Sequence, residues 1–262
     1  MKVDAKRFQV RLARDEGEIR AAQRLRYTVF VEEMGASASA EEHALRLERD
    51  RFDPFFDHLL LIDLLHPGED GINVVGVYRL LRGSVAQAGP GFYGQSEYDL
   101  EPLTRLGRET VELGRSCVHP DYRGGVAMHL LWSGLGEYVL SHGIEVLFGV
   151  ASFPGTDVDA VAQPLSHLYH SHLAPPALRV RTLADHYVEM NRMPASQIDA
   201  RQAMRQMPPL IKAYLRLGGV VGEGAFIDHD FNTIDVCLLM DTAAMTERYK
   251  DMYTRTTGKG IA

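Results

Sequence analysis

The sequence predicts a mixed α/β fold in which a central sheet is flanked by helices. Two kinds of segment alternate along the chain: some have hydrophobic residues at every second position, as strands do, and others have them at helical spacing. One continuous apolar run, Val146–Val150, directly follows an expected helix, which is typical of a parallel strand covered on both faces. With 262 residues, 45% of them hydrophobic, the chain can bury one sizeable core. We therefore expect a single domain over residues 1–262.

The first third of the chain is expected to contain a strand, a helix and a hairpin. Residues 8–13 alternate like a strand, and residues 15–30 have helical spacing, with an aspartate in first place as a plausible N-cap. From about residue 31 to 53 the chain is charged and lacks sustained periodicity, which predicts a mobile segment with at most a short helix. Strand-like residues 58–63 and 74–81 are separated by a Pro- and Gly-containing turn, which indicates a hairpin.

The centre and the last third continue this alternation. Residues 110–118 read as a strand, residues 119–125 as a turn and residues 126–141 as a helix. A helical insertion is expected at about residues 155–217, with helices at 161–172 and 200–217. Two further strands and a closing helix follow, at 225–227, 236–240 and 242–253.

Composition excludes several classes of protein. No continuous apolar run is long enough to cross a bilayer, and the N-terminal residues lack the pattern of a signal peptide, so we expect a cytoplasmic protein. A net charge of -7 disfavours a general nucleic-acid binder, because such proteins rely on clustered positive charge. Cys117 and Cys237 are far apart and have neither metal-type nor redox-type spacing, so two reduced thiols are expected.

The turn between the central strand and helix is a candidate anion site. Residues 120–125 read Pro-Asp-Tyr-Arg-Gly-Gly, and a Gly-rich turn before a helix exposes backbone N–H groups at the positive end of the helix dipole. The order of strand, Arg-Gly-Gly turn, helix and buried strand resembles the GNAT acyltransferase superfamily, in which this turn holds the pyrophosphate of a pantetheine carrier. The resemblance implies phosphopantetheine or carrier contacts at Val118, Arg123, Gly124, Gly125, Val126 and Ala127.

The glycine pattern of this turn favours one kind of acyl donor. The superfamily usually has Arg or Gln, two residues, Gly, one residue, then Gly or Ala, whereas Arg123 is followed directly by two glycines. We therefore expect acyl carrier protein, which brings its own protein contacts, rather than coenzyme A. The expected donor is acyl-phosphopantetheine on that carrier, with no permanently bound cofactor and no metal.

Several short blocks together resemble two related families. Residues 26–30, 50–53, 75–80 and 112–115 resemble acyl-homoserine lactone synthases in order and spacing. The chain is more similar to the ornithine lipid N-acyltransferases, through residues 57–60, 112–120, 165–175 and 228–233. This resemblance implies transfer of a 3-hydroxyacyl chain from acyl carrier protein to the α-amine of L-ornithine, which forms lyso-ornithine lipid. A glutamine-specific relative would share these blocks, and a lactone synthase or a non-catalytic lipid- or carrier-binding module stays an alternative.

The strand at residues 110–118 carries the main catalytic candidates. Glu112 is the expected base for the attacking amine, and its alternative role is a structural ion pair with an arginine. Arg115 could bind the substrate carboxylate or a carrier phosphate through bidentate geometry. Three positions separate the two residues, so a regular strand would point them to opposite faces. We therefore predict a bulge near Gly114 that re-aims one of them.

An acidic and basic set is expected at the same cleft. Asp53 is the third catalytic candidate, and the substrate-binding candidates are Arg79, Asp50, Arg26, His58 and Phe30. A buried Arg79 needs a carboxylate partner, for which Asp50 and Asp53 are the candidates. The set could recognise the amino acid, with Asp50 and Asp53 supplying negative charge for an ornithine side chain, or it could be a structural clamp.

Other groups have weaker functional interpretations. Cys117 and His119 would share a face of a regular strand and could form a nucleophilic pair, although direct amine attack needs none. The histidines 167, 170 and 172 are not expected to share a helix face, which argues against a metal site. The helix after residue 200 has an apolar side and several basic residues, so contact with the acidic carrier or with the inner membrane face is an open expectation.

Overall fold

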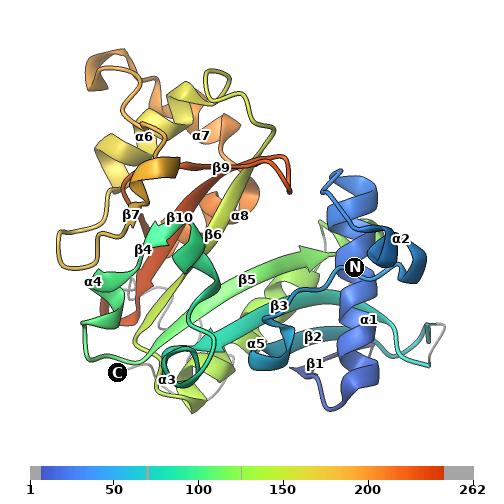
Figure 1. Cartoon of the computed structure of the whole chain (residues 1–262). Coiled ribbons are helices and arrows are strands. Elements are labelled where there is room, and N and C mark those ends of the chain that lie inside the picture. The colour runs from blue at the N-terminus through green and yellow to red at the C-terminus, as the bar shows by residue number, and fades with distance from the viewer. Residues whose placement is uncertain (1–6, 69–70, 125, 245–262) are drawn as a thin grey trace.

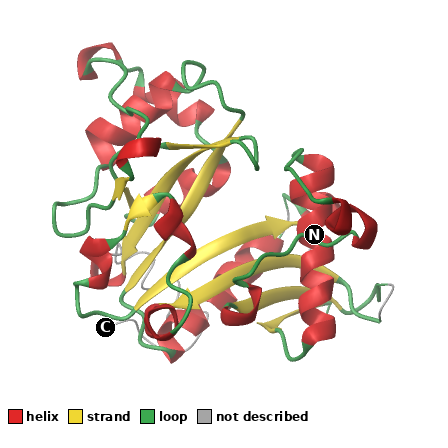
Figure 2. Ribbon diagram, viewed as in Figure 1, coloured by secondary structure: helices red, strands yellow, loops and turns green. Residues whose placement is uncertain are grey.

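The computed structural model describes residues 7–68, 71–124 and 126–244, which form a large mixed sheet with helices on both faces and a second, two-stranded sheet (Figures 1 and 2). The strand order is β1-β2-β3-β5-β6-β10-β8, and β9 also pairs with β10. The strands are β1 (Phe8–Leu12), β2 (Asp57–Asp63), β3 (Val74–Arg82), β5 (Thr110–Val118), β6 (Val146–Pro154), β8 (Val220–Val221), β9 (Phe226–Asp228) and β10 (Thr233–Asp241). The expected α/β class and the hairpin of β2 and β3 are confirmed.

The sheet opens between its two central strands. β5 and β6 are parallel, as predicted, but they pair only from Thr110–Leu113 to Val146–Gly149. Beyond these residues β5 leads toward α1, whereas β6 leads toward α6 and α7, so the two strands diverge like the arms of a V (Figure 1). Because of this divergence, the backbone groups on the facing edges of the two strands are free to hydrogen-bond to an extended ligand.

Two helices cover opposite faces of the first half of the sheet. α1 (Glu16–Arg26) packs on Leu60 and Val77, while α5 (Ala127–Ser141) packs on Leu59 and Leu61. The predicted cap of α1 is confirmed, because the Asp15 carboxylate accepts the Glu18 N–H at 2.9 Å. The predicted helix does not end at residue 30. It continues as a π-helix, Tyr27–Glu33, and such wider turns often occur at functional sites.

The segment that precedes β2 is folded onto the rest of the molecule. Its short helix α2 (Ala40–Leu45) begins with a capping box between Ser39 and Glu42, which confirms the short helix expected there. Leu47 and Phe52 are buried. The mobility expected of residues 31–53 stays a prediction.

Within the described residues, three α-helices follow β6, in the region where a helical insertion is expected. They are α6 (Ala162–His172), α7 (Ala200–Gln206) and α8 (Pro209–Arg216), and the strand β7 (Arg181–Thr182) pairs with β4 (Tyr98–Asp99). The predicted continuous helix 200–217 is wrong, because Met207 and Pro208 are extended. A proline has no N–H and disfavours a helical residue before it, so the Pro208-Pro209 pair ends one helix and begins another.

The remaining short elements complete the described part of the chain. α3 (Gly83–Ala88) and α4 (Glu101–Thr104) lie between β3 and β5. Thr242–Ala244 form a single 3-10 turn, and the rest of the helix predicted at 242–253 lies outside the described residues. Across the described ranges, no helix has the length and apolar character needed to span a bilayer.

Candidate active site

A cavity of about 400 Å³ lies where β5 and β6 diverge. Its lining comes mainly from β5, β6 and β10, with contributions from the π-helix, the loop before β4 and helices α5 and α8. In the described part of the chain, residues 114–118 of β5 and 150–154 of β6 have no ladder partner in each other. A substrate with amide groups can therefore hydrogen-bond between the two strands.

The strand register divides the cavity into a polar side and a mainly apolar side. Glu112 of β5 pairs with Phe148 of β6, which pairs with Leu239 of β10, so these three side chains share one face of the sheet. Because side chains alternate along β10, Asp235 is on that face too. The opposite face of the same strands contributes mainly apolar residues to the cavity, among them Leu113, Leu147, Leu238 and Met240, and one hydroxyl, that of Ser116, which bonds Tyr78.

The bulge predicted near Gly114 is confirmed, one residue further along β5. Arg115 and Ser116 together face the single residue Tyr78 of β3. Arg115 has a φ of 48°, a left-handed conformation that strand residues rarely adopt. The bulge breaks the alternation that would separate Arg115 from Glu112, and both side chains line the cavity.

Glu112 is buried and held by backbone donors. The N–H groups of Tyr93 and Gly94 donate to its two carboxylate oxygens at 2.8 and 2.6 Å. Burial raises the pKa of Glu112 to about 7, although these hydrogen bonds and the charges of Arg79 and Arg115 act in the opposite direction. A Cβ atom at Gly94 would be only 3.0 Å from Glu112 Oε1, so glycine permits this close approach. Glu112 is thus poised to exchange a proton near neutral pH, and the alternative of a direct ion pair with an arginine is not found among the described residues.

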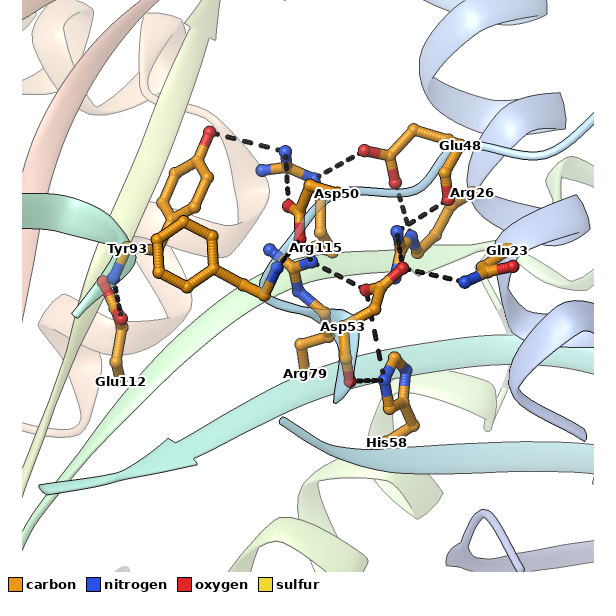
Figure 3. A network of polar contacts seen from close by, with 11 residues as sticks. Gln23, Arg26, Glu48, Asp50, Asp53, His58, Arg79, Tyr93, Glu112 and Arg115 are labelled. Carbon is orange, nitrogen blue, oxygen red and sulfur yellow. Dashed lines mark hydrogen bonds and ion pairs between the residues drawn. The ribbon is translucent and has the colours of Figure 1, made fainter. Parts of the chain in front are cut away.

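Three arginines and three carboxylates form a closed network beside Glu112 (Figure 3). Its members are Arg26, Arg79, Arg115, Glu48, Asp50 and Asp53. Asp53 is the centre, because it accepts hydrogen bonds from Arg26 at 2.7 Å, from Arg79 at 2.8 Å and from Gln23 at 2.8 Å. Burial opposes ionisation of Asp53, but the charges of Arg26 and Arg79 outweigh it and hold the pKa of that carboxyl well below its usual range.

Arg115 joins this network to the cavity. Its guanidinium donates to Glu48 at 3.0 Å and, more weakly, to Asp50 and the Tyr93 hydroxyl, both at 3.4 Å. It also lies over the ring of Phe231, 4.4 Å from the centroid. No described residue hydrogen-bonds its Nη1, so Arg115 can still bind an anion in the cavity.

The structure separates the predicted substrate-binding set into two groups. Phe30 and Arg79 line the cavity, as do Glu112 and Arg115. The lining does not include Asp53, Asp50, Arg26 or His58 within the described part of the chain. The Asp53 carboxylate is taken up by Arg26, Arg79 and Gln23. Its assignment as a catalytic residue stays a prediction.

The same network also bears on the expectation that Asp50 and Asp53 supply negative charge for an ornithine side chain. Three guanidinium groups offset the three carboxylates, so the set has no surplus negative charge for an amino-acid side chain. His58 also contacts this network, since its Nε2–H donates to the Asp53 carbonyl at 3.1 Å. Burial lowers the pKa of His58, which keeps the imidazole neutral.

Sequence reasoning missed two of the polar groups on the far wall of the cavity. Glu97 and Asp235 are only 4% and 3% exposed, and both line the cavity together with Asp228 and Thr233. Glu97 follows a 3-10 turn in a loop, and Asp235 is the one charged residue among residues 234–240 of β10. An aspartate at an otherwise apolar strand position was the one local signal available.

The predicted anion turn has a different arrangement from the one expected. The Arg123 guanidinium donates to the Val118 carbonyl at 2.9 Å and forms an ion pair with Glu33 at the end of the π-helix. Arg123 and Val118 line the cavity, whereas Gly124, Val126 and Ala127 do not appear in the described lining. Gly125 lies outside the described residues. Phosphate binding at this turn stays a prediction.

The alternative chemistries find little support. Burial raises the pKa of Cys117 to about 12, so its thiol is neutral at physiological pH and a poor nucleophile. The expectation that the α6 histidines point apart is wrong for one pair, because the rings of His167 and His172 are 5.4 Å apart where the helix ends. The described residues contain no group of three potential metal ligands.

Comparisons with known proteins identify relatives of this chain and structures that share its fold. A family model described as an acetyltransferase (GNAT) domain matches residues 25–133. An L-ornithine N(alpha)-acyltransferase of Rhodobacter capsulatus is 58% identical over 248 residues, which cover 95% of each chain. An L-ornithine N(alpha)-acyltransferase of Agrobacterium fabrum is 43% identical over 94% of this chain and 85% of its own. A solved N-acyl amino acid synthase from uncultured soil microbes shares the fold, with a TM-score of 0.50 and 12% identity over 91% of this chain and 95% of that one.

Proposed function

Because the chain belongs to the L-ornithine N(alpha)-acyltransferase family and has the GNAT fold, we propose that it moves a 3-hydroxyacyl chain from acyl carrier protein to the α-amine of L-ornithine. The product of this transfer is lyso-ornithine lipid, an amide with a free carboxylate. The reaction needs a base for the ammonium, a seat for the carboxylate and an apolar path for the acyl chain. The protein is an acyltransferase, and the donor and product are the proposed parts.

One observation carries this proposal: the cavity at the diverging strands has charged groups on one sheet face and mainly apolar residues on the other. Glu112 and Arg115 line the polar side. Leu147, Leu238 and Met240 line the apolar side. An amphiphilic product with a charged head and a long acyl chain matches a cavity of this kind.

The acceptor half of the reaction begins with proton removal. Glu112, with a pKa of about 7, takes a proton from the α-ammonium directly or through one water molecule. Arg115 binds the α-carboxylate through its free Nη1 and so holds the amine beside Glu112. The network around Asp53 fixes Arg115 and Arg79 in place, which keeps the substrate seat from reorganising during the reaction.

The donor half uses the open strand edges. The two amides of phosphopantetheine can hydrogen-bond between β5 and β6, while the acyl chain extends along the apolar side. The amine nitrogen forms a bond to the thioester carbonyl carbon, and the carbon–sulfur bond then breaks. The second proton of the attacking nitrogen ends on the departing thiol, so no enzyme nucleophile is consumed.

The contacts that Arg123 already makes favour acyl carrier protein as the donor. The Arg123 guanidinium is already bound to Glu33 and to the Val118 carbonyl, so it is not poised for a nucleotide pyrophosphate. A carrier protein supplies its own contacts and needs fewer from this turn. Helix α8 borders the cavity through Leu210 and Tyr214 and carries Lys212 and Arg216, which can meet the acidic carrier or anionic lipid.

We place the enzyme in the cytoplasm, with peripheral contact at the inner face of the membrane. The support is chemical: its donor is a cytoplasmic carrier and its product is an amphiphile that partitions into lipid. Flotation of the purified protein with anionic vesicles tests this contact.

Product analysis tests the reaction. Purified protein is given 3-hydroxyacyl carrier protein and, separately, L-ornithine, L-glutamine or S-adenosylmethionine. The expected result is a product of the mass of Nα-acyl ornithine, formed with release of one free thiol. A lactone product would instead identify an acyl-homoserine lactone synthase, and an acyl glutamine would assign the glutamine-specific branch. Binding of the donor without any product would indicate a non-catalytic module.

A further inference from the structure

The far wall of the cavity contains three buried side-chain oxygens that make no hydrogen bond of normal length and angle to a described residue, although Ser152 and Thr233 are near enough to the Asp235 carboxylate to act on its pKa. The three oxygens are Oε2 of Glu97, Oδ1 of Asp235 and Oγ1 of Thr233. All three residues are at most 4% exposed and line the cavity. A buried polar group without a well-formed hydrogen bond is costly, so three of them in one place indicate a site built for a ligand.

The three acceptors share one side of the cavity. Thr233 and Asp235 are two positions apart on β10, and so their side chains point to the same sheet face. Glu97 comes from the loop before β4. The next residue, Tyr98 of β4, donates a hydrogen bond from its hydroxyl to the Asp235 carbonyl at 3.0 Å, which holds this loop against β10. Burial, together with the charges of Asp235 and Asp228, raises the pKa of Glu97 to about 8.

The acids of this wall have no described basic side chain paired with them, unlike the carboxylates of the arginine network. Glu97, Asp228 and Asp235 have no ion pair with a described arginine or lysine. Asp228 uses one oxygen to accept the N–H groups of Asp230 and Phe231 in the turn after β9. A cation bound here would satisfy the acceptors and favour the ionised form of the acids.

We propose that Glu97, Asp235 and Thr233 bind the side-chain ammonium of ornithine and thereby select this amino acid. A primary ammonium has three N–H donors and no acceptor, which matches three acceptor atoms without a well-formed hydrogen bond. The neutral amide of glutamine would bring its own carbonyl oxygen against the same acceptors. The inference rests on the proposed function, because it assigns the side-chain subsite of the acceptor.

The assignment also explains which amine reacts. Ornithine has two amines, and the one held by carboxylates stays protonated and non-nucleophilic. Glu112 lies on the same sheet face but in β5, where it can deprotonate the α-ammonium beside Arg115. The two ends of the amino acid are thus distinguished by an acidic subsite at one end and an arginine with a base at the other.

The test compares L-ornithine with L-norvaline, which has the same carbon skeleton without the side-chain amine. In Glu97→Gln and in Asp235→Asn, we expect kcat/KM for ornithine to fall about 100-fold or more, while the value for norvaline changes less than about threefold. Thr233→Val removes one neutral acceptor, and a loss of about fivefold with ornithine alone is expected. Asp185→Asn, an exposed acid outside the cavity lining, is the matched control.

Equal losses with both amino acids, or an unchanged ornithine rate, would overturn the assignment. Thermal unfolding of each variant identifies those that do not fold, and the remaining isosteres still decide the question. Calorimetric binding of both amino acids to the wild-type protein gives a readout that does not depend on acyl transfer. Tighter binding of ornithine without any ornithine product would refute the proposed function but not this subsite, and equal binding would refute the subsite.

Discussion

Replacement of Glu112 by glutamine tests the proposed base with little change in side-chain volume. A positioned general base contributes about 10²- to 10⁴-fold to a rate, so we expect kcat to fall by that factor, or about 3 to 5 kcal/mol in activation free energy. The glutamine amide can accept only one of the two N–H groups of Tyr93 and Gly94 that now donate to the carboxylate. Its NH₂ group would face the other N–H, which adds to the loss.

The pH profile gives the same test a sharper form. With the pKa of Glu112 at about 7, wild-type kcat/KM should decrease as the pH falls through 7, because the protonated carboxyl cannot accept the ammonium proton. The decrease should approach about tenfold per pH unit well below that value. In the Glu112→Gln variant this acidic limb should disappear.

The assay is release of carrier thiol, measured from pH 5.5 to 8.5 and checked by product mass. Glu137→Gln on the exposed side of α5 is the matched control, and it should retain wild-type activity. If the Glu112→Gln variant keeps a rate within about threefold of the wild type, or keeps the same acidic limb, Glu112 is not the base.

Three further predictions concern the surroundings of this base. Asp53→Asn leaves Arg26 and Arg79 without their shared counter-ion, so we expect the free energy of unfolding in urea to fall by about 3 to 5 kcal/mol, and an unchanged value would show the network to be dispensable. Glu97 has a pKa of about 8 in the fold and an ordinary value of 4.5, so its contribution to stability is lost as the pH rises between these values. Glu97→Gln should therefore stabilise the protein at pH 9 by roughly 2 to 4 kcal/mol more than at pH 5, and an equal effect at both pH values would contradict the burial of a neutral acid. Cys117→Ala should keep transfer within about threefold, because direct amine attack needs no thiolate, whereas loss of activity together with an acyl-enzyme trapped in the wild type would restore the nucleophile hypothesis.

Some features of the site could be predicted because they follow from local geometry. Glu112 and Arg115 are three positions apart in a strand, and alternation alone requires an irregularity if both are to face one site. The bulge at Arg115 and Ser116 is that irregularity. The pairing of Arg79 with Asp50 and Asp53 also followed from the cost of an unpaired buried guanidinium.

Other features depend on charges that come together from distant parts of the chain. The sequence could not show that Arg26, Arg79 and Arg115 all converge on residues 48–53 and leave Asp50 and Asp53 without surplus charge. It also could not show that Glu97 faces Asp235 across 138 positions, since neither residue belongs to a recognisable motif. Net charge at a site is a sum over neighbours in space, and only the folded chain defines those neighbours.

The sequence by itself determined the mixed α/β class, the order of the central strand, turn and helix, and the family, because hydrophobic period and short motifs are local properties. It did not determine where the helix after residue 200 breaks in detail, how far the first helix extends, or which acids remain unpaired. The tertiary structure decided that β5 and β6 separate after Leu113 and Gly149. That separation places an apolar wall and a charged wall around one cavity, because each strand presents alternate side chains to opposite faces of the same sheet.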